Sequence, residues 1–227
     1  MNSYSLILAL SASLGLWLAI RRVPTTDIPR RIDEGFLLLA AALVGARLDY
    51  TLQHHAYYAQ HVGEAFAFWQ GGLGWLGAVF GGALALAVLT AFKRRSLAKE
   101  ADLFLPLLPT LAIGAWLGCW SVGTAPGADS LIPLQLLAAV SFIAGFLTLP
   151  RLLPQPAPAG LYASAAFALF AVLQFGFDFR RVDSRPPFLH MPVDRWGALF
   201  LLIFSLGVLV WRVLAWWQTR PTDTHQH

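Results

Sequence analysis

Charged residues are scarce in this chain of 227 residues, since Asp, Glu, Lys and Arg together make up 12% of it. That is about half the share of a typical soluble domain, and 57% of the residues are hydrophobic. Apolar runs of roughly 20 residues, the length of helix that crosses the hydrocarbon of a bilayer, recur along the whole sequence. The composition argues against a water-soluble domain and predicts an all-α integral membrane protein.

Cysteine and basic N-terminal residues are nearly absent as well. The single cysteine, Cys119, excludes an intramolecular disulfide. No Lys or Arg precedes the first apolar run, whereas Arg21 and Arg22 follow it. This polarity is opposite to that of a cleavable signal peptide, so we expect the first run to be a transmembrane helix. The basic residues lie in short loops rather than along one face, which argues against a nucleic-acid partner.

Seven apolar runs predict seven transmembrane helices in one domain of residues 1–220, followed by a disordered polar tail of residues 221–227. The predicted spans are residues 4–20, 35–53, 71–92, 103–122, 131–149, 158–177 and 196–217. The loops after the first and third spans carry four basic residues each, and loops 54–70 and 123–130 carry none. Because Lys and Arg concentrate on the cytoplasmic side, we expect the N-terminus outside and the C-terminus in the cytoplasm.

Loop 178–195 does not follow this distribution, because it should lie outside and yet is rich in charge. Its charged residues are Asp178, Arg180, Arg181, Asp183, Arg185, Asp194 and Arg195. One explanation is an anionic ligand, such as a phospholipid head group. The alternatives are mutual pairing in a solvated loop and an error in the number of helices.

Arg47 is the most informative single residue, because a charge within a spanning helix is costly and usually faces the bundle interior or a water-filled cavity. Its guanidinium could clamp a phosphate or carboxylate; the alternative is that it extends to the outer interface and pairs with Asp49. Gly71 and Gly72 open the third span, where backbone amides could meet a lipid head group, although helix packing alone also explains a glycine-rich segment.

Two further segments bear on a site. Glycines at 118, 123 and 127 with a proline at 126 predict that the fourth helix ends in a tight turn, which is tolerated at membrane depth only inside protein or beside a cavity. His54, His55 and His61 match no strong metal-binding spacing. We therefore expect no metal and no cofactor.

Five segments carry a family resemblance: GARLDY (45–50), WQGGL (69–73), IGAWLGCWSVGTAPG (113–127), PLQL (133–136) and QFGFDFRR (174–181). In this order they resemble motifs of the prolipoprotein diacylglyceryl transferases, seven-helix enzymes of the bacterial inner membrane. These enzymes move diacylglycerol from phosphatidylglycerol to the thiol of the lipobox cysteine of prolipoproteins. The resemblance implies phosphatidylglycerol, or another anionic phospholipid, and a prolipoprotein signal peptide as partners.

The resemblance also implies which residues form the site. It suggests catalytic roles for Arg47, Asp178 and Arg181. The residues it suggests for substrate binding are Tyr4, Gly71, Gly72, Gly123, Gly127 and Gln135.

Several polar residues of the family are replaced in this sequence. The family histidine falls at Leu76, an arginine at Trp116, an asparagine at Cys119, an acidic residue at Thr124, a tyrosine at Phe170 and a second arginine at Gln174. The transfer needs a base for the thiol and fixed positive charge for the departing glycerol phosphate, and losing one such donor costs about a hundredfold in rate. Three readings stay open: a transferase that uses the remaining residues, a transferase with another donor or acceptor, and a non-catalytic homologue that binds lipid or a membrane partner.

Overall fold

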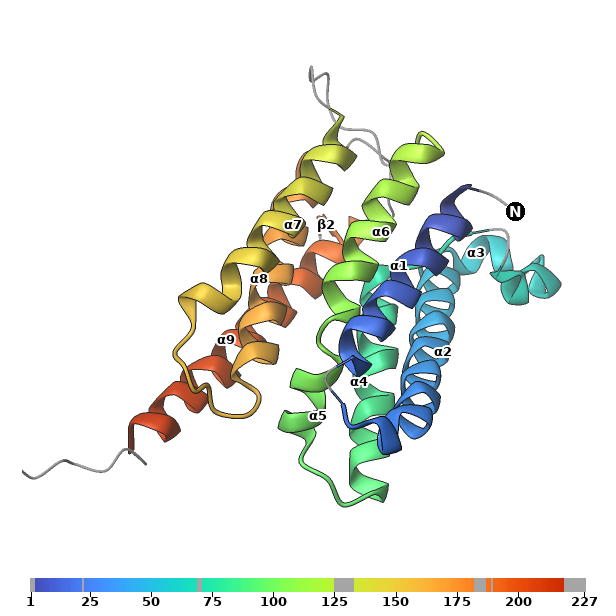
Figure 1. Cartoon of the computed structure of the whole chain (residues 1–227). Coiled ribbons are helices and arrows are strands. Elements are labelled where there is room, and N and C mark those ends of the chain that lie inside the picture. Colours follow the sequence, from blue (N-terminus) through green and yellow to red (C-terminus); the bar gives the residue numbers. More distant parts are fainter. Residues whose placement is uncertain are drawn as a thin grey trace, which may run out of the picture.

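The computed structural model describes residues 3–21, 23–68, 71–124, 133–181, 187–188 and 190–218, and most of them are helical (Figure 1). The long helices are α1 (Ser3–Ile20), α2 (Ile28–Gln53), α4 (Trp75–Phe92), α6 (Leu107–Ser121), α7 (Leu134–Leu152), α8 (Leu161–Asp178) and α9 (Val193–Gln218). Shorter elements are η1 (Thr25–Asp27), α3 (His55–Tyr58), η2 (Val62–Phe66) and α5 (Leu97–Phe104). Strands β1 (Pro187–Phe188) and β2 (Met191–Pro192) form an antiparallel pair.

The predicted class and number of spans are confirmed, because seven helical segments are long and apolar enough to cross a membrane. Two differences from the predicted spans are larger than the others. The second helix begins at Ile28 rather than at residue 35, and the fourth span is divided at Pro106 into α5 and α6. The orientation of the termini stays a prediction, and the tail of residues 221–227 lies outside the described residues.

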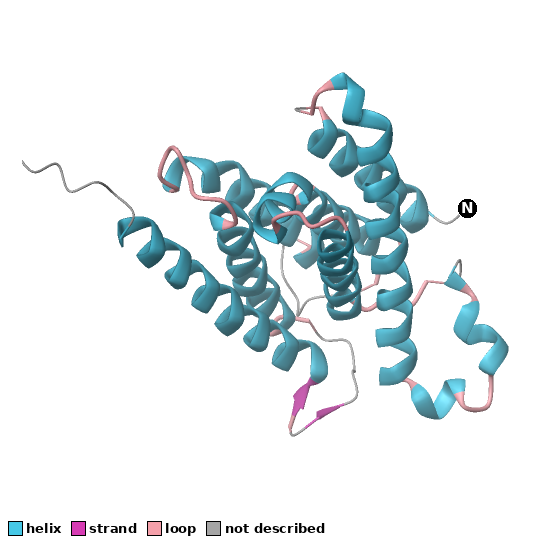
Figure 2. Cartoon of the chain, turned by 90° about the horizontal axis from the view of Figure 1, so that it is seen from below, coloured by secondary structure: helices cyan, strands magenta, loops and turns pink. Residues whose placement is uncertain are grey.

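The helices form a bundle with two distinct ends, which we name after their place in Figure 1. The upper end carries the N-terminal end of α1, α3 and β2, and the lower end carries α5 and the end of α9 (Figure 1). Within the bundle, α2 packs along α4, α1 along α6 and α8 along α9. Seen along the bundle, α3 and η2 lie to one side of it beside α2 (Figure 2).

An apolar centre rich in aromatic rings joins α4, α6, α7 and α8. We call Trp75, Trp116, Phe142, Phe170 and Phe177 the aromatic core. Phe142 is fully buried and Trp116 is 6% exposed. Ring centroids lie 5.9 Å apart for Trp116 and Phe177 and 5.5 Å apart for Trp75 and Phe170, both with edge-to-face geometry, which is favourable for aromatic pairs.

The lower end contains a buried ion cluster, which explains the early start of α2. Glu34 is 2% exposed and is bound by Lys93 at 2.5 Å, Arg31 at 2.9 Å and Arg95 at 3.2 Å. Arg31 also binds Glu100 of α5 at 2.5 Å. A buried carboxylate is stable only when it is paired in this way, so the cluster fixes the corner between α4 and α5 against α2.

Helices α2 and α4 cross with their backbones in direct contact. A Cβ atom at Gly77 would collide with the carbonyl oxygen of Gly45, and one at Gly81 would collide with the carbonyl oxygen of Ala41. Gly82, the next residue of α4, has only ordinary contact at 3.7 Å with the Ala42 side chain. Small residues at these spacings allow membrane helices to approach closely, so the crossing depends on Gly77 and Gly81 and not on Gly82.

This crossing predicts opposite effects for two adjacent substitutions. Gly81→Ala should lower stability by about 1–3 kcal/mol, because the new methyl group meets backbone that cannot rotate away. Gly82→Ala should leave stability unchanged or raise it by up to about 1 kcal/mol, because alanine favours the helix. Thermal unfolding of both variants in one detergent checks this, and equal melting temperatures would contradict the crossing.

Candidate functional site

Arg47 is buried at the upper end and donates hydrogen bonds to backbone carbonyls of the segment before α4. Only 3% of the Arg47 surface is exposed. Nε donates to Ala65 at 2.9 Å and Nη2 to Glu64 at 2.5 Å, while Nη1 donates to Gly71 at 2.5 Å and Gly72 at 3.2 Å. The guanidinium therefore joins both ends of residues 64–72 to α2.

The two consecutive glycines allow the chain to present these carbonyls. Gly71 has a φ of +86° and Gly72 a φ of +68°, a conformation that glycine adopts without steric cost. A Cβ at Gly72 would also lie 2.5 Å from the Tyr50 ring and 2.9 Å from Arg47 Nη1. In this structure the carbonyls of Gly71 and Gly72 face Arg47, which gives these residues a role that the sequence did not reveal.

Asp49 does not bind Arg47; its carboxylate binds the start of α4 instead. One oxygen of its carboxylate accepts the backbone N–H of Gly77 at 2.9 Å, and the other accepts Gln53 Nε2 at 2.8 Å. Gly77 is the third residue of α4, where N–H groups lack partners within the helix. The pairing with Asp49 that was considered for Arg47 does not occur within the described residues.

Aromatic residues brace the segment that Arg47 holds. The guanidinium of Arg47 lies 5.3 Å from the ring of Tyr58 and 5.9 Å from the ring of Tyr50. Tyr57 stacks on His61 and donates a hydrogen bond to the Glu64 carboxylate at 2.7 Å. That hydrogen bond raises the pKa of the Tyr57 phenol. The loop is thus a defined structure fixed to α2.

Asp178 and Arg195 form an ion pair at the upper ends of α8 and α9. Asp178 is 3% exposed, and Arg195 Nε lies 3.2 Å from Asp178 Oδ2. Arg195 Nη2 also donates to the backbone carbonyl of Asp178 at 3.1 Å. Within loop 178–195, the described residues therefore show mutual pairing, which was one of the explanations considered for its charge.

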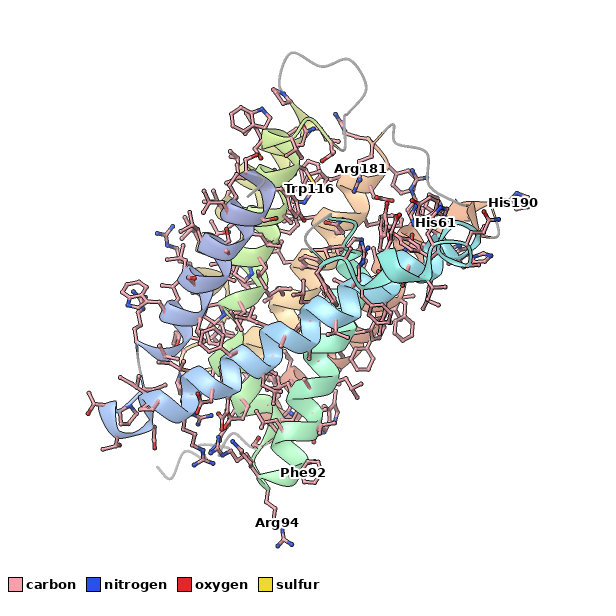
Figure 3. The ribbon with its side chains drawn as sticks, turned by 90° about the vertical axis from the view of Figure 1, so that its right-hand side faces the viewer. His61, Phe92, Arg94, Trp116, Arg181 and His190 are labelled. Atoms are coloured by element: carbon pink, nitrogen blue, oxygen red, sulfur yellow. The ribbon has the colours of Figure 1, made fainter. Side chains whose placement is uncertain are left out.

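Arg181 lies over the aromatic core, with its guanidinium carbon 5.8 Å from the centre of the Trp116 ring. Figure 3 shows Arg181 above Trp116 at the upper end. A chain of contacts also connects α2 with α9, because Gln53 Nε2 bonds to Asp194 at 3.2 Å as well as to Asp49. Arg195, Asp194 and Gln53 are polar site residues that the resemblance did not single out.

The remaining predicted residues lie around the upper end of α6. Tyr4 packs its ring against Gly118. Gly123, with a φ of +68°, ends α6 as predicted, since its N–H bonds to Trp120 and the next N–H bonds to Cys119. Gln135 donates to the Thr124 carbonyl at 2.8 Å. Gly127 lies outside the described residues.

Apart from the exposed Thr124, the positions at which the family carries other polar residues are apolar or buried here. Trp116 and Phe170 belong to the aromatic core, and Leu76 packs against Gly197 of α9. Gln174 is 5% exposed on α8. The described residues contain no group of three or more His, Cys, Asp and Glu side chains arranged to hold a metal ion. The site therefore consists of the Asp178–Arg195 ion pair and Arg181, next to an apolar interior.

Comparison with known proteins identifies the family. A family model described as prolipoprotein diacylglyceryl transferase matches residues 1–219. A phosphatidylglycerol–prolipoprotein diacylglyceryl transferase of Trichormus variabilis is 30% identical over 217 residues, which cover 91% of this chain and 72% of the relative.

Shorter matches agree with this assignment. The protein of the same name from Thermosynechococcus vestitus is 34% identical over 140 residues, which cover 60% of this chain and 52% of the relative. The one from Limosilactobacillus reuteri is 33% identical over 119 residues, covering 52% and 42%. The matched region thus spans about half the length of these two relatives. With residues 1–219 matched by the family model, the chain belongs to the prolipoprotein diacylglyceryl transferase family.

Proposed function

We propose that this chain transfers the diacylglyceryl group of phosphatidylglycerol to the lipobox cysteine of prolipoproteins in the bacterial cytoplasmic membrane. The observation that carries the proposal is the family match over residues 1–219, together with Asp178, Arg195 and Arg181 at the upper end of the bundle. The predicted orientation, with the N-terminus outside, puts this upper end on the side of the membrane to which prolipoproteins are exported.

The transfer requires two chemical tasks from the upper end. The cysteine sulfur forms a bond to a glyceryl carbon while the bond from that carbon to a phosphate oxygen breaks, and glycerol phosphate leaves. Asp178, which is paired with Arg195, accepts the thiol proton. Arg181 supplies positive charge to the phosphate as it departs. Tyr4, Gly123 and Gln135, which are also predicted binding residues, lie at the same end of the bundle.

Arg47 positions the segment beside the site. Its hydrogen bonds to the carbonyls of Glu64, Ala65, Gly71 and Gly72 fix the loop between α2 and α4 to α2. We therefore assign Arg47 the role of holding this loop, through which it supports the binding of substrate by Gly71 and Gly72.

A second candidate function is lipid binding without transfer. It is favoured by apolar residues at positions where the family has charged or polar residues. These are Trp116 and Phe170 of the aromatic core, and Leu76. In addition, Trp75 Nε1 is buried and has no hydrogen-bond partner within the described part of the chain. The ester carbonyl of a bound lipid could accept that N–H group.

A rescue experiment separates the two candidates. Expressed in a bacterial strain depleted of its own diacylglyceryl transferase, the chain should restore the mass increase of a reporter lipoprotein. The rate should be about a hundredfold or more below that of a relative with the family histidine and arginines, because fixed donors are missing. No mass increase, from protein shown to be folded and in the membrane, would favour lipid binding alone.

The roles of Asp178 and Arg181 predict a selective loss of transfer. Asp178→Asn and Arg181→Ala should each lower the lipidation rate by about 100-fold, since each removes a charge acting on the reacting groups. Arg151→Ala, at the lower end of α7, is the control and should keep the full rate. Rates are measured by mass spectrometry of the reporter in membranes containing equal amounts of each variant. Unchanged rates for both upper-end variants would remove these residues from the mechanism.

The role of Arg47 predicts a local loosening. Arg47→Leu leaves several partly buried carbonyls without a donor and should destabilise the loop by roughly 2–4 kcal/mol, given the strength of hydrogen bonds from charged groups. Amide hydrogen exchange should then rise in residues 62–74, while residues 134–152 of α7 keep their protection. Arg47→Lys should restore only part of the protection, because lysine lacks the planar fork. Lost lipidation with unchanged exchange would mean that Arg47 acts on substrate directly.

A further inference from the structure

The lower end of α4 stops in a turn that normally contains glycine. The N–H of Arg94 bonds to the carbonyl of Ala91 at 3.2 Å, and the N–H of Arg95 bonds to the carbonyl of Thr90 at 2.9 Å. This pair of bonds is the Schellman motif, in which the residue between helix and exit adopts a left-handed conformation and is usually glycine. Helix α6 ends in the same way with Gly123. In α4 that position is Arg94, with a φ of +50°.

An arginine in this conformation is disfavoured relative to glycine, and its side chain does not compensate through contacts with the protein. Lys93 and Arg95, on either side, bind the buried Glu34. The guanidinium of Arg94 has no hydrogen bond or ion pair among the residues that the structure describes, and it is exposed. Figure 3 shows it projecting beyond the end of α4. A strained residue without an internal role suggests an external ligand.

The surroundings of Arg94 carry an excess of positive charge. Five basic side chains gather at this corner, against the two acidic side chains of the buried cluster. The basic residues are Arg30, Arg31, Lys93, Arg94 and Arg95, and the acidic residues are Glu34 and Glu100. Including the exposed flanking residues Lys99, Asp27 and Asp33, positive charge still exceeds negative by two. The corner therefore attracts an anion.

An apolar groove lies directly above these charges on α4. Val88, Ala91 and Phe92 line a shallow groove of about 320 Å³. Phe92 is 86% exposed and ends the membrane-spanning segment of the helix. In Figure 3 its ring projects sideways from the bundle just above Arg94. Free phosphate would bind only to the cations, and an acyl chain alone would fill only the groove.

We propose that the lower end of α4 binds one anionic phospholipid of the adjacent leaflet, with its phosphate against Arg94 and Lys93 and an acyl chain in the groove of Val88, Ala91 and Phe92. Basic side chains next to a spanning helix attract anionic lipid in this way. The site is at the opposite end of the bundle from Asp178 and Arg181, so it is separate from the proposed transfer and from its substrate.

Photo-crosslinking at the groove tests this site. The protein carrying p-benzoylphenylalanine at position 92 is reconstituted in vesicles with equal amounts of phosphatidylglycerol and phosphatidylcholine, irradiated, and analysed by mass. Phosphatidylglycerol adducts should exceed phosphatidylcholine adducts by roughly fivefold, the preference expected from one cation near anionic lipid. The same probe at Ile203, which is 63% exposed in the middle of α9 and far along the helix from Arg195 and Arg212, is the control and should give nearly equal adducts.

Arg94→Gly separates lipid binding from folding. Because glycine suits the left-handed turn, the variant should melt at a higher temperature in lipid-free detergent, while its adduct ratio at position 92 falls toward one. A ratio at position 92 equal to that at position 203 would overturn the proposal, as would a ratio unchanged by Arg94→Gly, or crosslinks to protein instead of lipid. None of these measurements needs transferase activity, so failure of the rescue experiment would leave this site untouched.

Discussion

The geometry of the upper end depends on one buried cation, the guanidinium of Arg47. A charge inside a spanning segment needs anions or dipoles around it, and within the described residues backbone carbonyls supply them. For those carbonyls to face inward, the chain must turn at Gly71 and Gly72, and α4 must then begin where the Asp49 carboxylate reaches its first turn. The loop, the two glycines and the start of α4 therefore form one unit around Arg47.

Much of the fold could be predicted from the sequence, because the length of each apolar run sets where a helix can cross a bilayer. The early start of α2 could not be predicted in this way. Residues 28–34 are rich in charge and read as a loop, since hydropathy records the charge of Glu34 but not its partners Lys93 and Arg95, far along the chain. Pro106 divides the fourth span without ending it, so composition alone did not reveal the break between α5 and α6.

The candidate site was less predictable than the fold. The sequence directed attention to Arg47, Gly71 and Gly72 but not to the contact among them, because carbonyl acceptors belong to every residue and leave no pattern. The charge of loop 178–195 was visible, whereas the pairing of Asp178 with Arg195 depends on how α8 and α9 meet. The resemblance showed which polar residues were replaced. Only the structure shows that Trp116 and Phe170 occupy the space as a packed aromatic core.

The backbone contact between α2 and α4 also has a mechanical consequence. With no side chains between Gly45, Gly77 and Gly81 to yield, these two helices can only move together, as a single rigid plate. Across from this plate, α9 meets it through the Gln53–Asp194 hydrogen bond and the packing of Leu76 on Gly197. Breaking one hydrogen bond and sliding one leucine costs far less than separating the two backbones. The seam between α4 and α9 is therefore easier to open than the crossing of α2 and α4.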